Sequence, residues 1–489
     1  MRRRFFRLVR GAAILCLVIM ATLLVARAVD SQRGPPLELW HTYVPDEVHA
    51  GDVDRLDWGG YLAAEARVFD AVRSEVTDKL PPEERTPDNR YFAEAPINPD
   101  RFAQNWNRSY MLEPAGTPVG AVVLLHGLTD SPYSLRHIAR RYRDLGYVAI
   151  AIRLPAHGTV PAALTDISWE DWLAATRLAV REARRRVGPT APLHMVGFSN
   201  GGALAMKYAL DAIEDPRLTR PDRLILISPM IGITAFARFA GLAALPAVLP
   251  AFAKAAWLGV VPEFNPFKYN SFPVNGARQS HRLTMALQDQ ILRMSRAGRL
   301  EGLAPVLTFQ SVMDFTVSTR AVVSALYANL PANGSELVLF DRNRNTKLGP
   351  LLRPVFDAAL NRLLPAPPQK FRMTTIANAG SDSAEIVERV VEAGETAEHE
   401  RSLGLLYPRA VYSLSHVALP FPPSDGLYGN EPDPAEDFGV QFGALAARGE
   451  VGVLIISMDS LARISWNPFF PYVIARIEGG IGRPPAHSE

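Results

Sequence analysis

Runs of apolar, largely β-branched residues alternate with helical stretches along the middle of this chain. The strand-like runs occupy residues 119–127, 147–153, 192–199 and 223–229. Helical periodicity fills the intervals at 133–145, 169–187 and 201–213. Strands that are apolar on both faces and are separated by helices form a mainly parallel sheet, which helices cover on each side. The alternation therefore predicts an α/β fold.

The alternation stops after Ser228 and resumes later in the chain. Residues 230–303 are rich in Ala, Leu and Phe and contain no strand-like run, which predicts a helical cap. Strand patterns return at 304–311, 335–341 and 409–415, with a possible extra strand at 372–378. The predicted organisation is an N-terminal segment at 1–29, a linker and helical extension at 30–117, a first core half at 118–229, a cap at 230–303, a second core half at 304–420 with an insertion at 342–408, and a C-terminal extension at 421–489.

The segments that flank the core differ in character. Residues 30–57 are polar and contain proline, which is typical of a linker. Apolar residues then recur at helical spacing from Trp58 to Leu80, so we expect one amphipathic helix that ends at Pro81. The extension at 421–489 begins with a turn-rich loop, and we expect it to pack on the sheet, with a membrane-facing patch as the alternative.

The N-terminus has the layout of an export signal or a membrane anchor. The first ten residues are strongly basic, and residues 11–26 carry no charge. Sixteen helical residues span about 24 Å, somewhat less than a hydrocarbon core of about 30 Å. An A-x-A pattern at 26–28 would allow cleavage, whereas an intact segment would anchor the chain. In either case we expect the remaining domain to be membrane-anchored or exported and to lie outside the cytoplasm.

Composition excludes several classes of protein. The chain has 489 residues and a single cysteine, Cys16, so it forms neither an internal disulfide nor a Cys-rich metal site. Its 52 basic and 50 acidic residues nearly cancel. Six arginines precede Asp30, and without them the balance is 46 − 50 = −4. A nucleic-acid-binding protein normally has a basic face, so we expect no nucleic-acid partner.

A G-x-S-x-G pattern lies between a predicted strand and a predicted helix. It reads Gly197-Phe198-Ser199-Asn200-Gly201. A tight strand-to-helix turn exposes the serine hydroxyl, and glycines two residues on either side allow close backbone packing. A serine becomes a nucleophile only when a base removes its proton. We therefore predict that Ser199 is a nucleophile, although an ordinary strand–turn–helix corner would share the pattern.

Acyl transfer at a serine requires backbone N–H groups around the developing oxyanion. The predicted strand at 119–127 ends at His126-Gly127-Leu128. We expect the N–H groups of Leu128 and Asn200 to form this oxyanion hole. His126 precedes the serine in the chain, so we expect it to support the loop structurally rather than to act as the base.

The base and its acidic partner should follow later strands. Of the ten histidines, His416 follows a late apolar run and opens a loop, so we predict that it is the base. Asp314 follows the strand at 304–311, and its rival Asp341 follows the next strand. We favour Asp314, which gives the chain order Ser199, Asp314, His416, an order known for one scaffold with this chemistry.

These motifs resemble the α/β-hydrolase superfamily, in particular its carboxylesterase, monoacylglycerol-lipase-like and serine-aminopeptidase-like branch. The motifs that carry the resemblance are HGLTDSP (126–132), LPAHG (154–158), GFSNGG (197–202), SVMDFTV (311–317) and SLSHV (413–417). It implies an eight-stranded, mostly parallel sheet with a cap, and attack by Ser199 assisted by His416 and Asp314. Two features depart from the usual pattern: Asn200 stands where members often carry Met or Gln, and the stretch from Asp341 to His416 is long.

We therefore expect a serine hydrolase that cleaves carboxylic esters through an acyl-enzyme, without a metal or an organic cofactor. A hydrophobic or lipid-like ester would suit an enzyme with a membrane segment and an apolar cap. Amidase, peptidase or thioesterase activity remains an alternative, as does a binding protein that retains only the fold. The cap side chains that could line an acyl pocket, or simply pack the cap on the core, are Phe236, Phe239, Leu242, Leu245, Leu249, Phe252 and Trp257.

Overall fold

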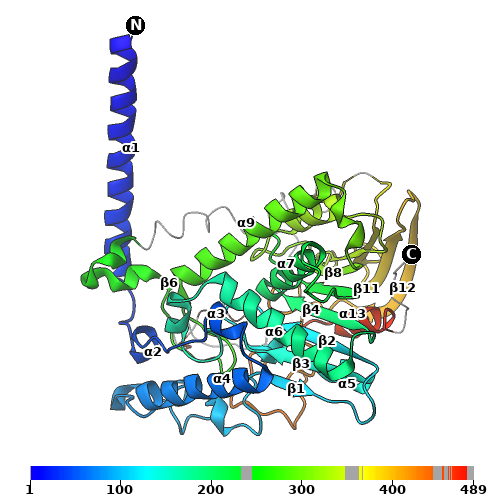
Figure 1. Cartoon of the computed structure of the whole chain (residues 1–489), viewed down its shortest axis with the longest axis horizontal. Helices are drawn as coiled ribbons and strands as arrows, with labels where there is room; N and C mark the ends of the chain where they lie inside the picture. The colour runs from blue at the N-terminus through cyan, green and yellow to red at the C-terminus, as the bar shows by residue number, and fades with distance from the viewer. Residues whose placement is uncertain are drawn as a thin grey trace.

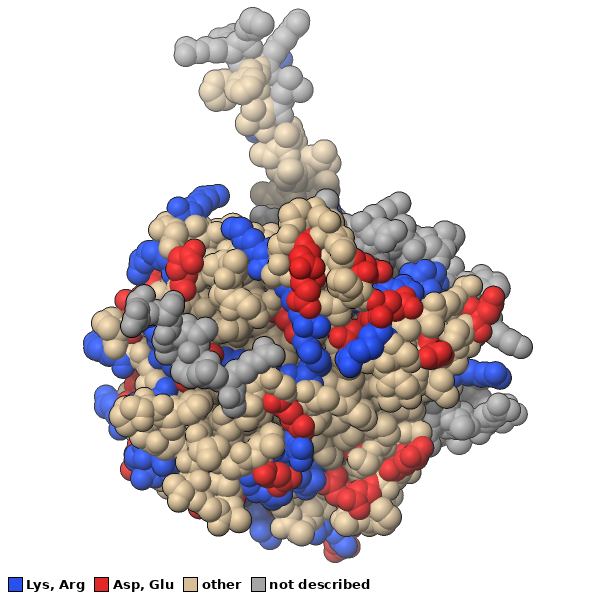
Figure 2. All heavy atoms as spheres, turned by 90° about the vertical axis from the view of Figure 1, so that its right-hand side faces the viewer, with Lys and Arg blue, Asp and Glu red and all other residues tan. Residues whose placement is uncertain are grey.

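A single long helix stands out from a layered α/β body in the computed structural model (Figure 1). The structure describes residues 2–232, 245–346, 363–365, 367–443, 454–455, 457, 461, 463 and 465–481. The projecting helix is α1 (Arg2–Ser31). Seen from the β12 side, Lys and Arg are interspersed with Asp and Glu over the body, whereas uncharged residues make up most of the visible part of α1 (Figure 2).

The described residues form one ten-stranded sheet in the order β1-β3-β2-β4-β5-β8-β9-β10-β11-β12. Neighbouring strands run parallel from β3 to β10, and β1, β11 and β12 are antiparallel to their neighbours. The mainly parallel sheet is confirmed. Its strands are β1 (Tyr110–Leu112), β2 (Gly120–Leu125), β3 (Tyr147–Ile152), β4 (Leu193–Phe198), β5 (Arg223–Ile227), β8 (Val306–Ser311), β9 (Glu336–Phe340), β10 (Arg372–Asn378), β11 (Glu385–Val391) and β12 (Glu398–Leu406).

The far edge of the sheet differs from the expected eight-stranded form. The possible strand at 372–378 is β10, which pairs with β9, and β11 and β12 extend the sheet further. The strand expected at 409–415 is wrong, because that segment is irregular. Its backbone bonds instead to Asn343, whose N–H donates to the Tyr412 carbonyl at 2.8 Å. The edge of β9 is already occupied by β10, so no strand position remains beside it for this segment.

Helices cover both faces of the sheet, as the double-sided apolar strands predict. Along β2, the side chains of Ala121, Val123 and Leu125 join the cluster that contains α6 (Trp169–Val187) and α7 (Asn200–Glu214). The alternate residues, Val122 and Leu124, join the cluster of α5 (Arg136–Asp144) and α13 (Phe470–Glu478). This period of two is that of a strand buried between two layers.

The segment before the core is more ordered than a linker. Residues 30–57 contain α2 (Leu39–Thr42) and α3 (Ala50–Val53), and Trp40 and Val53 are buried in the core. The expectation of a linker was wrong because apolar side chains within this polar stretch pack against the body. The helix expected from Trp58 is α4 (Trp58–Val72), which continues as a π-helical turn through Arg73–Thr77.

The described part of the cap combines short and long helices. It contains the 3₁₀ helices η7 (Leu245–Val248) and η8 (Pro250–Ala256), strands β6 (Trp257–Gly259) and β7 (Phe272–Pro273), and α9 (Val274–Arg296), which packs on α7. Of the side chains suggested for an acyl pocket, Leu245 and Leu249 are exposed and Trp257 is buried against His41. Phe236, Phe239 and Leu242 lie outside the described residues.

The described part of the C-terminal extension packs on the body. Asp425 is fully buried and accepts hydrogen bonds from the hydroxyl of Tyr133 at 2.8 Å and from Arg136 at 2.7 Å. Helix α13 buries Phe470 and Val473 in the same layer as α5. These contacts tie the extension to the segment that follows β2, and thus support one side of the candidate site.

Candidate active site

Backbone strain is concentrated at the carboxyl ends of four neighbouring strands. Among the described residues, the non-glycine residues with positive φ are Thr129, Ala156, Ser199 and Ser228. They lie in the loops after β2, β3, β4 and β5 respectively. The carboxyl ends of parallel strands are where open α/β sheets bind ligands, and strained residues cluster at such sites. The candidate site is therefore at this edge of the sheet.

Ser199 occupies a sharp turn between β4 and α7. Its φ is 54° and its ψ is −115°, a conformation that a non-glycine residue adopts only when its surroundings impose it. A Cβ on Gly197 would lie 2.4 Å from the Gly201 carbonyl oxygen, and one on Gly201 would lie 2.0 Å from that of Leu125. Only glycine fits at these two positions. The close packing holds Ser199 at the start of α7, where the helix N-terminus favours negative charge.

The loop after β2 lies directly against Ser199. A Cβ on Gly127 would lie 3.3 Å from the Ser199 Cβ. His126 is buried, its Nε2 accepts from the Leu154 N–H at 3.0 Å, and its Nδ1 lies 2.9 Å from the Gly127 carbonyl oxygen. Burial and the neighbouring His157 hold the pKa of His126 well below its usual value. A neutral ring that bonds on both sides fixes the loop, and it is not free to serve as a base.

The backbone amides of Leu128 and Asn200 directly follow Gly127 and Ser199 in the chain. In the part of the chain that the structure describes, neither the Leu128 N–H nor the Asn200 N–H donates to another protein group. The cap holds the loop after β2 in place, because the Tyr269 N–H donates to the Thr129 carbonyl at 2.7 Å. Both amides thus follow residues of the candidate site, Gly127 and Ser199, and have no protein acceptor among the described residues.

Asp314 and His416 form a hydrogen-bonded pair. The Asp314 Oδ2 and the His416 Nδ1 are 2.9 Å apart, and the Asp314 side chain is fully buried. Its Oδ1 accepts from the N–H groups of Thr316 and Val317, at 2.8 and 3.0 Å. Burial alone would raise the pKa of Asp314, but His416 and these N–H donors outweigh it and hold the pKa below its ordinary value. A carboxylate is therefore maintained beside the ring.

Further residues that the sequence did not single out hold this pair in place. The Ser228 hydroxyl and the Gln310 amide donate to the Asp314 Oδ2, at 3.0 and 3.1 Å. The Ser311 hydroxyl donates to the Leu414 carbonyl at 2.9 Å and so ties the His416 loop to the end of β8. In the sequence, these residues could be noticed only as polar residues at the ends of β5 and β8. Their spacing alone does not indicate that they bond to Asp314 or to the His416 loop.

His416 contacts Phe198, the residue that precedes the serine. The Phe198 and His416 rings stack with centroids 5.2 Å apart. None of the hydrogen bonds between described residues joins the Ser199 hydroxyl to His416, and the His416 Nε2 bonds to none of those residues. Asp314 thus occupies Nδ1, and Nε2 is the ring nitrogen that has no hydrogen-bond partner among the described residues.

The rival carboxylate lies in a different environment. Asp341 is buried at the end of β9, where its Oδ2 pairs with Arg344 at 2.9 Å. Its Oδ1 accepts from the Arg342 N–H at 2.8 Å. These contacts neutralise Asp341 locally, whereas Asp314 faces the histidine, so the geometry favours Asp314.

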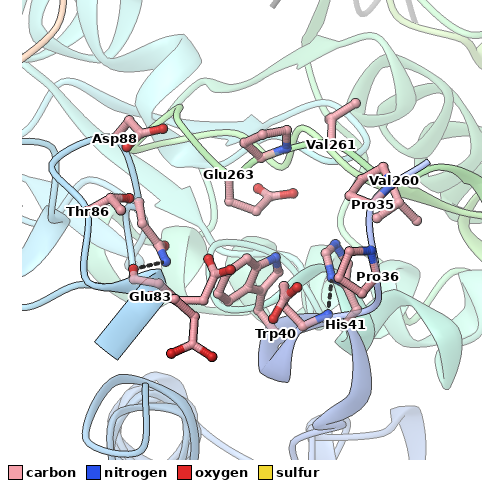
Figure 3. Close-up of a pocket in the computed structure, with 14 residues that line it drawn as sticks. Pro35, Pro36, Trp40, His41, Glu83, Thr86, Asp88, Val260, Val261 and Glu263 are labelled. Carbon is pink, nitrogen blue, oxygen red and sulfur yellow. Dashed lines mark hydrogen bonds between the residues drawn. The ribbon is translucent and has the colours of Figure 1, made fainter. Parts of the chain in front are cut away.

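A cavity of about 310 Å³ lies elsewhere, between the segment after α1, the 83–89 loop and the cap (Figure 3). Trp40, Glu83, Asp88 and Glu263 are among the residues that line it, together with Pro35, Pro36, Val260 and Val261. It contains none of the residues of the candidate site. Among the described residues, no group of three or more His, Cys, Asp or Glu side chains could hold a metal ion.

Parts of this chain are similar to a known family and to known proteins. A family model described as "Serine aminopeptidase, S33" matches residues 116–344. The thermostable monoacylglycerol lipase of Bacillus sp. (strain H-257) is 33% identical over 92 residues, which are 19% of this chain and 35% of that protein. Phospholipase YtpA of Bacillus subtilis (strain 168) is 27% identical over 120 residues, which are 24% of this chain and 44% of that protein.

The matches thus span about a third of the first relative and under half of the second. Among solved structures, a soluble variant of the monoglyceride lipase from Saccharomyces cerevisiae is similar with a TM-score of 0.36 and 14% identity, over 48% of this chain and 82% of that one. The matched segment 116–344 begins just before β2 and includes the Ser199 turn and Asp314. By its strand order and its strained strand-to-helix turn at Ser199, and with this family model matching residues 116–344, the chain has the α/β-hydrolase fold.

Proposed function

We propose that the protein hydrolyses carboxylic esters, with Ser199 as nucleophile, His416 as general base and Asp314 as the carboxylate that orients the base. The observation that carries the proposal is the strained turn at Ser199, which lies against the Gly127 loop on one side and beside the Phe198-stacked His416 on the other. Backbone strain of this kind persists only where the surrounding structure imposes it, and it clusters at active sites.

The geometry supports a two-step acyl transfer. His416 Nδ1 is engaged by Asp314, so the Ser199 proton moves to Nε2 as Oγ attacks the ester carbonyl carbon. The N–H groups of Leu128 and Asn200 bind the resulting oxyanion, a contribution of about 3 kcal/mol for each such donor. The alcohol leaves with the proton from His416. Water deprotonated by the same ring then attacks the acyl-enzyme, and the carboxylic acid is released.

The substrate class we propose is a hydrophobic, lipid-like ester. Two observations support it: the matched relatives are named a monoacylglycerol lipase and a phospholipase, and α1 contains a stretch, Phe5–Ser31, that is long and apolar enough to cross a membrane. The description of the family model favours aminopeptidase activity as the second candidate.

We further propose that α1 stays attached and anchors the domain outside the cytoplasm. The arginine-rich start of α1 is the end expected to remain in the cytoplasm. Arg27 donates to the Trp257 carbonyl and Ala28 is buried, so cleavage after Ala28 would remove contacts that the folded domain uses.

A fluorophosphonate probe tests the nucleophile in the full chain. We expect labelling of the unaltered protein, no labelling of Ser199→Ala, and labelling of His416→Ala at a greatly reduced rate. Ser324→Ala, which removes an exposed helical hydroxyl, should label like the unaltered protein. Absence of labelling in the unaltered protein, or equal labelling of Ser199→Ala, would refute the proposal.

The substrate class is tested by a chain-length series of p-nitrophenyl esters, beside peptide and thioester substrates. We expect esters to give the highest kcat/KM and longer acyl chains to be preferred. A higher kcat/KM for aminoacyl amides would establish the aminopeptidase candidate instead.

A further inference from the structure

The last two turns of α1 pack on the cap, whereas the rest of the helix projects freely. Of the described side chains of α1, only Leu24, Arg27, Ala28 and Ser31 are not exposed. They stand at positions i, i+3, i+4 and i+7, which places them on one face of the helix. That face contacts η7 and η8, which lie beside the base of α1 (Figure 1). We call residues 245–256, which comprise η7 and η8, the foot.

Polar contacts fix the foot to the base of α1. Arg27 donates to the Trp257 carbonyl, immediately after η8. Gln32 Nε2 donates to the Ala251 carbonyl at 3.0 Å, and the Lys254 ammonium donates to the Gly34 carbonyl at 3.2 Å. The foot therefore has a set position relative to the helix.

The outer surface of the foot is apolar. Leu245, Val248 and Leu249 are 46%, 81% and 58% exposed. Its sequence, LPAVLPAFAKAA, contains one charged residue, Lys254. Exposed apolar residues that are contiguous in this way mark an interaction surface rather than ordinary surface variation.

We infer that the foot lies in the interfacial layer of the same bilayer that α1 crosses, so that the cap rests on the membrane. This inference rests on the anchoring of α1 proposed above. The occupant is lipid because the foot lies beside the outer end of an apolar helix and contacts one face of it (Figure 1), so any bilayer that holds this helix meets the foot at that level. Exposed leucine and valine side chains next to a lysine are typical of a segment that inserts shallowly into a membrane surface.

The charged residues of α1 indicate how deeply the foot lies in the membrane. Arg10 and Arg27 bound the uncharged stretch of the helix, and their charged groups belong at the two membrane surfaces. Arg27 contacts the residue that follows the foot, which places the foot at the headgroup level rather than in the hydrocarbon. The chain reaches Glu38 shortly after α1, and the cavity there is also lined by the exposed Glu83 and the half-buried Asp88, whose carboxylates belong in water (Figure 3). The foot therefore inserts shallowly.

This position has a consequence for substrate supply. The foot leads through β6 and β7 into α9, whose Ser280 hydroxyl donates to the Asn200 side chain at 3.3 Å, directly beside Ser199. A cap seated on the bilayer holds the candidate site close to lipid-borne esters. The foot should therefore favour esters within a membrane and have little effect on soluble ones.

Site-specific fluorescence tests the location directly. In a Cys16→Ala background, Val248→Cys carries an environment-sensitive fluorophore, and the full chain is reconstituted in phosphatidylcholine nanodiscs. We expect a blue-shifted emission that doxyl-labelled phosphatidylcholine quenches. The matched control, Val119→Cys, labels an exposed valine before β2, which is 57% exposed and outside the foot, and it should show neither change. An unshifted, unquenched label at 248 overturns the inference.

Kinetics test the consequence. With an ester carried in phosphatidylcholine vesicles, Val248→Asp and Leu249→Asp should lower kcat/KM by about 5-fold or more, because a buried carboxylate is costly at an interface. Hydrolysis of a short soluble p-nitrophenyl ester should stay within about 2-fold, and Val119→Asp should alter neither rate. Equal rates for the Asp variants and the unaltered protein on vesicles, or an equal loss on both substrates, would overturn the inference. The fluorescence experiment does not depend on enzymatic activity. The position of the foot can therefore be tested even if the protein does not hydrolyse esters.

Discussion

The two halves of the core reach the candidate site in different ways. In the first half, 118–229, His126 and Ser199 directly follow β2 and β4, and the positive-φ residues other than glycine in the described chain all lie there. In the second half, 304–420, Asp314 and His416 lie in loops that side-chain hydrogen bonds hold in place. Close backbone packing thus holds the site residues of the first half, and it leaves little room for a larger side chain. Individual hydrogen bonds hold those of the second half, and we expect the loss of each bond to have its own measurable effect.

The largest effect should come from the carboxylate of the second half. Asp314→Asn should lower kcat about 10⁴-fold, because an amide does not hold His416 in the tautomer that accepts a proton at Nε2. Asp341→Asn should leave kcat within about 3-fold, since Asp341 pairs with Arg344 instead. Ester hydrolysis by the two purified variants makes the comparison. An equal loss in both would mean that the second half contributes no single catalytic carboxylate.

The next effect tests backbone packing in the first half. Gly201→Ala should lower the free energy of unfolding by about 3 kcal/mol, because the new Cβ meets the Leu125 carbonyl oxygen at 2.0 Å and neither backbone can move freely. Gly380→Ala, at the turn between β10 and β11, has no atom within 4 Å and should be nearly neutral. Urea denaturation measures both. A neutral Gly201→Ala would show that the turn at Ser199 can relax.

Buried histidines should make the first half acid-sensitive. Burial lowers the pKa of His157 from 6.5 to about 4, so below pH 6.5 the unfolded chain binds a proton that the native state does not. The contribution of neutral His157 to the free energy of unfolding is therefore present above pH 6.5 and is lost as the pH falls towards 4. Between pH 6.5 and 5 this residue should account for about 2 kcal/mol of the decrease.

Denaturation at the two pH values tests this assignment. His157→Gln should remove that part of the pH dependence, whereas His399→Gln, on the exposed strand β12, should leave it unchanged. An identical pH dependence in His157→Gln and the unaltered protein would contradict the assignment.

The smallest effect concerns the loop of His416. Ser311→Ala removes the hydrogen bond to the Leu414 carbonyl and should lower the free energy of unfolding by about 1 kcal/mol. It should also lower kcat through a displaced His416, while labelling by a fluorophosphonate slows but persists. Ser324→Ala serves as the control for both measurements. Unchanged kcat and stability in Ser311→Ala would show that other contacts suffice to position the loop.

Much of the first half could be predicted because its elements are local. The strands at β2, β3, β4 and β5 and the helix α6 follow from apolar runs and periodicity within a few residues. The second half was harder: the segment 409–415 has the apolar pattern of a strand, yet it lies beside Asn343 because β10 already occupies the edge of β9. The pattern of apolar residues within a segment does not indicate which strand of the sheet still has an edge available for pairing.

The sequence by itself determined the mainly parallel α/β sheet, the apolar N-terminal helix and the turn around Ser199, since strand and helix periodicity and glycine spacing are properties of neighbouring residues. Only the tertiary structure decided that Asp314 rather than Asp341 faces His416, that Ser228 and Gln310 hold it there, and that the base of α1 packs on the foot. Those contacts join residues far apart in the chain, and their partners are selected by packing and by the pairing of buried polar groups.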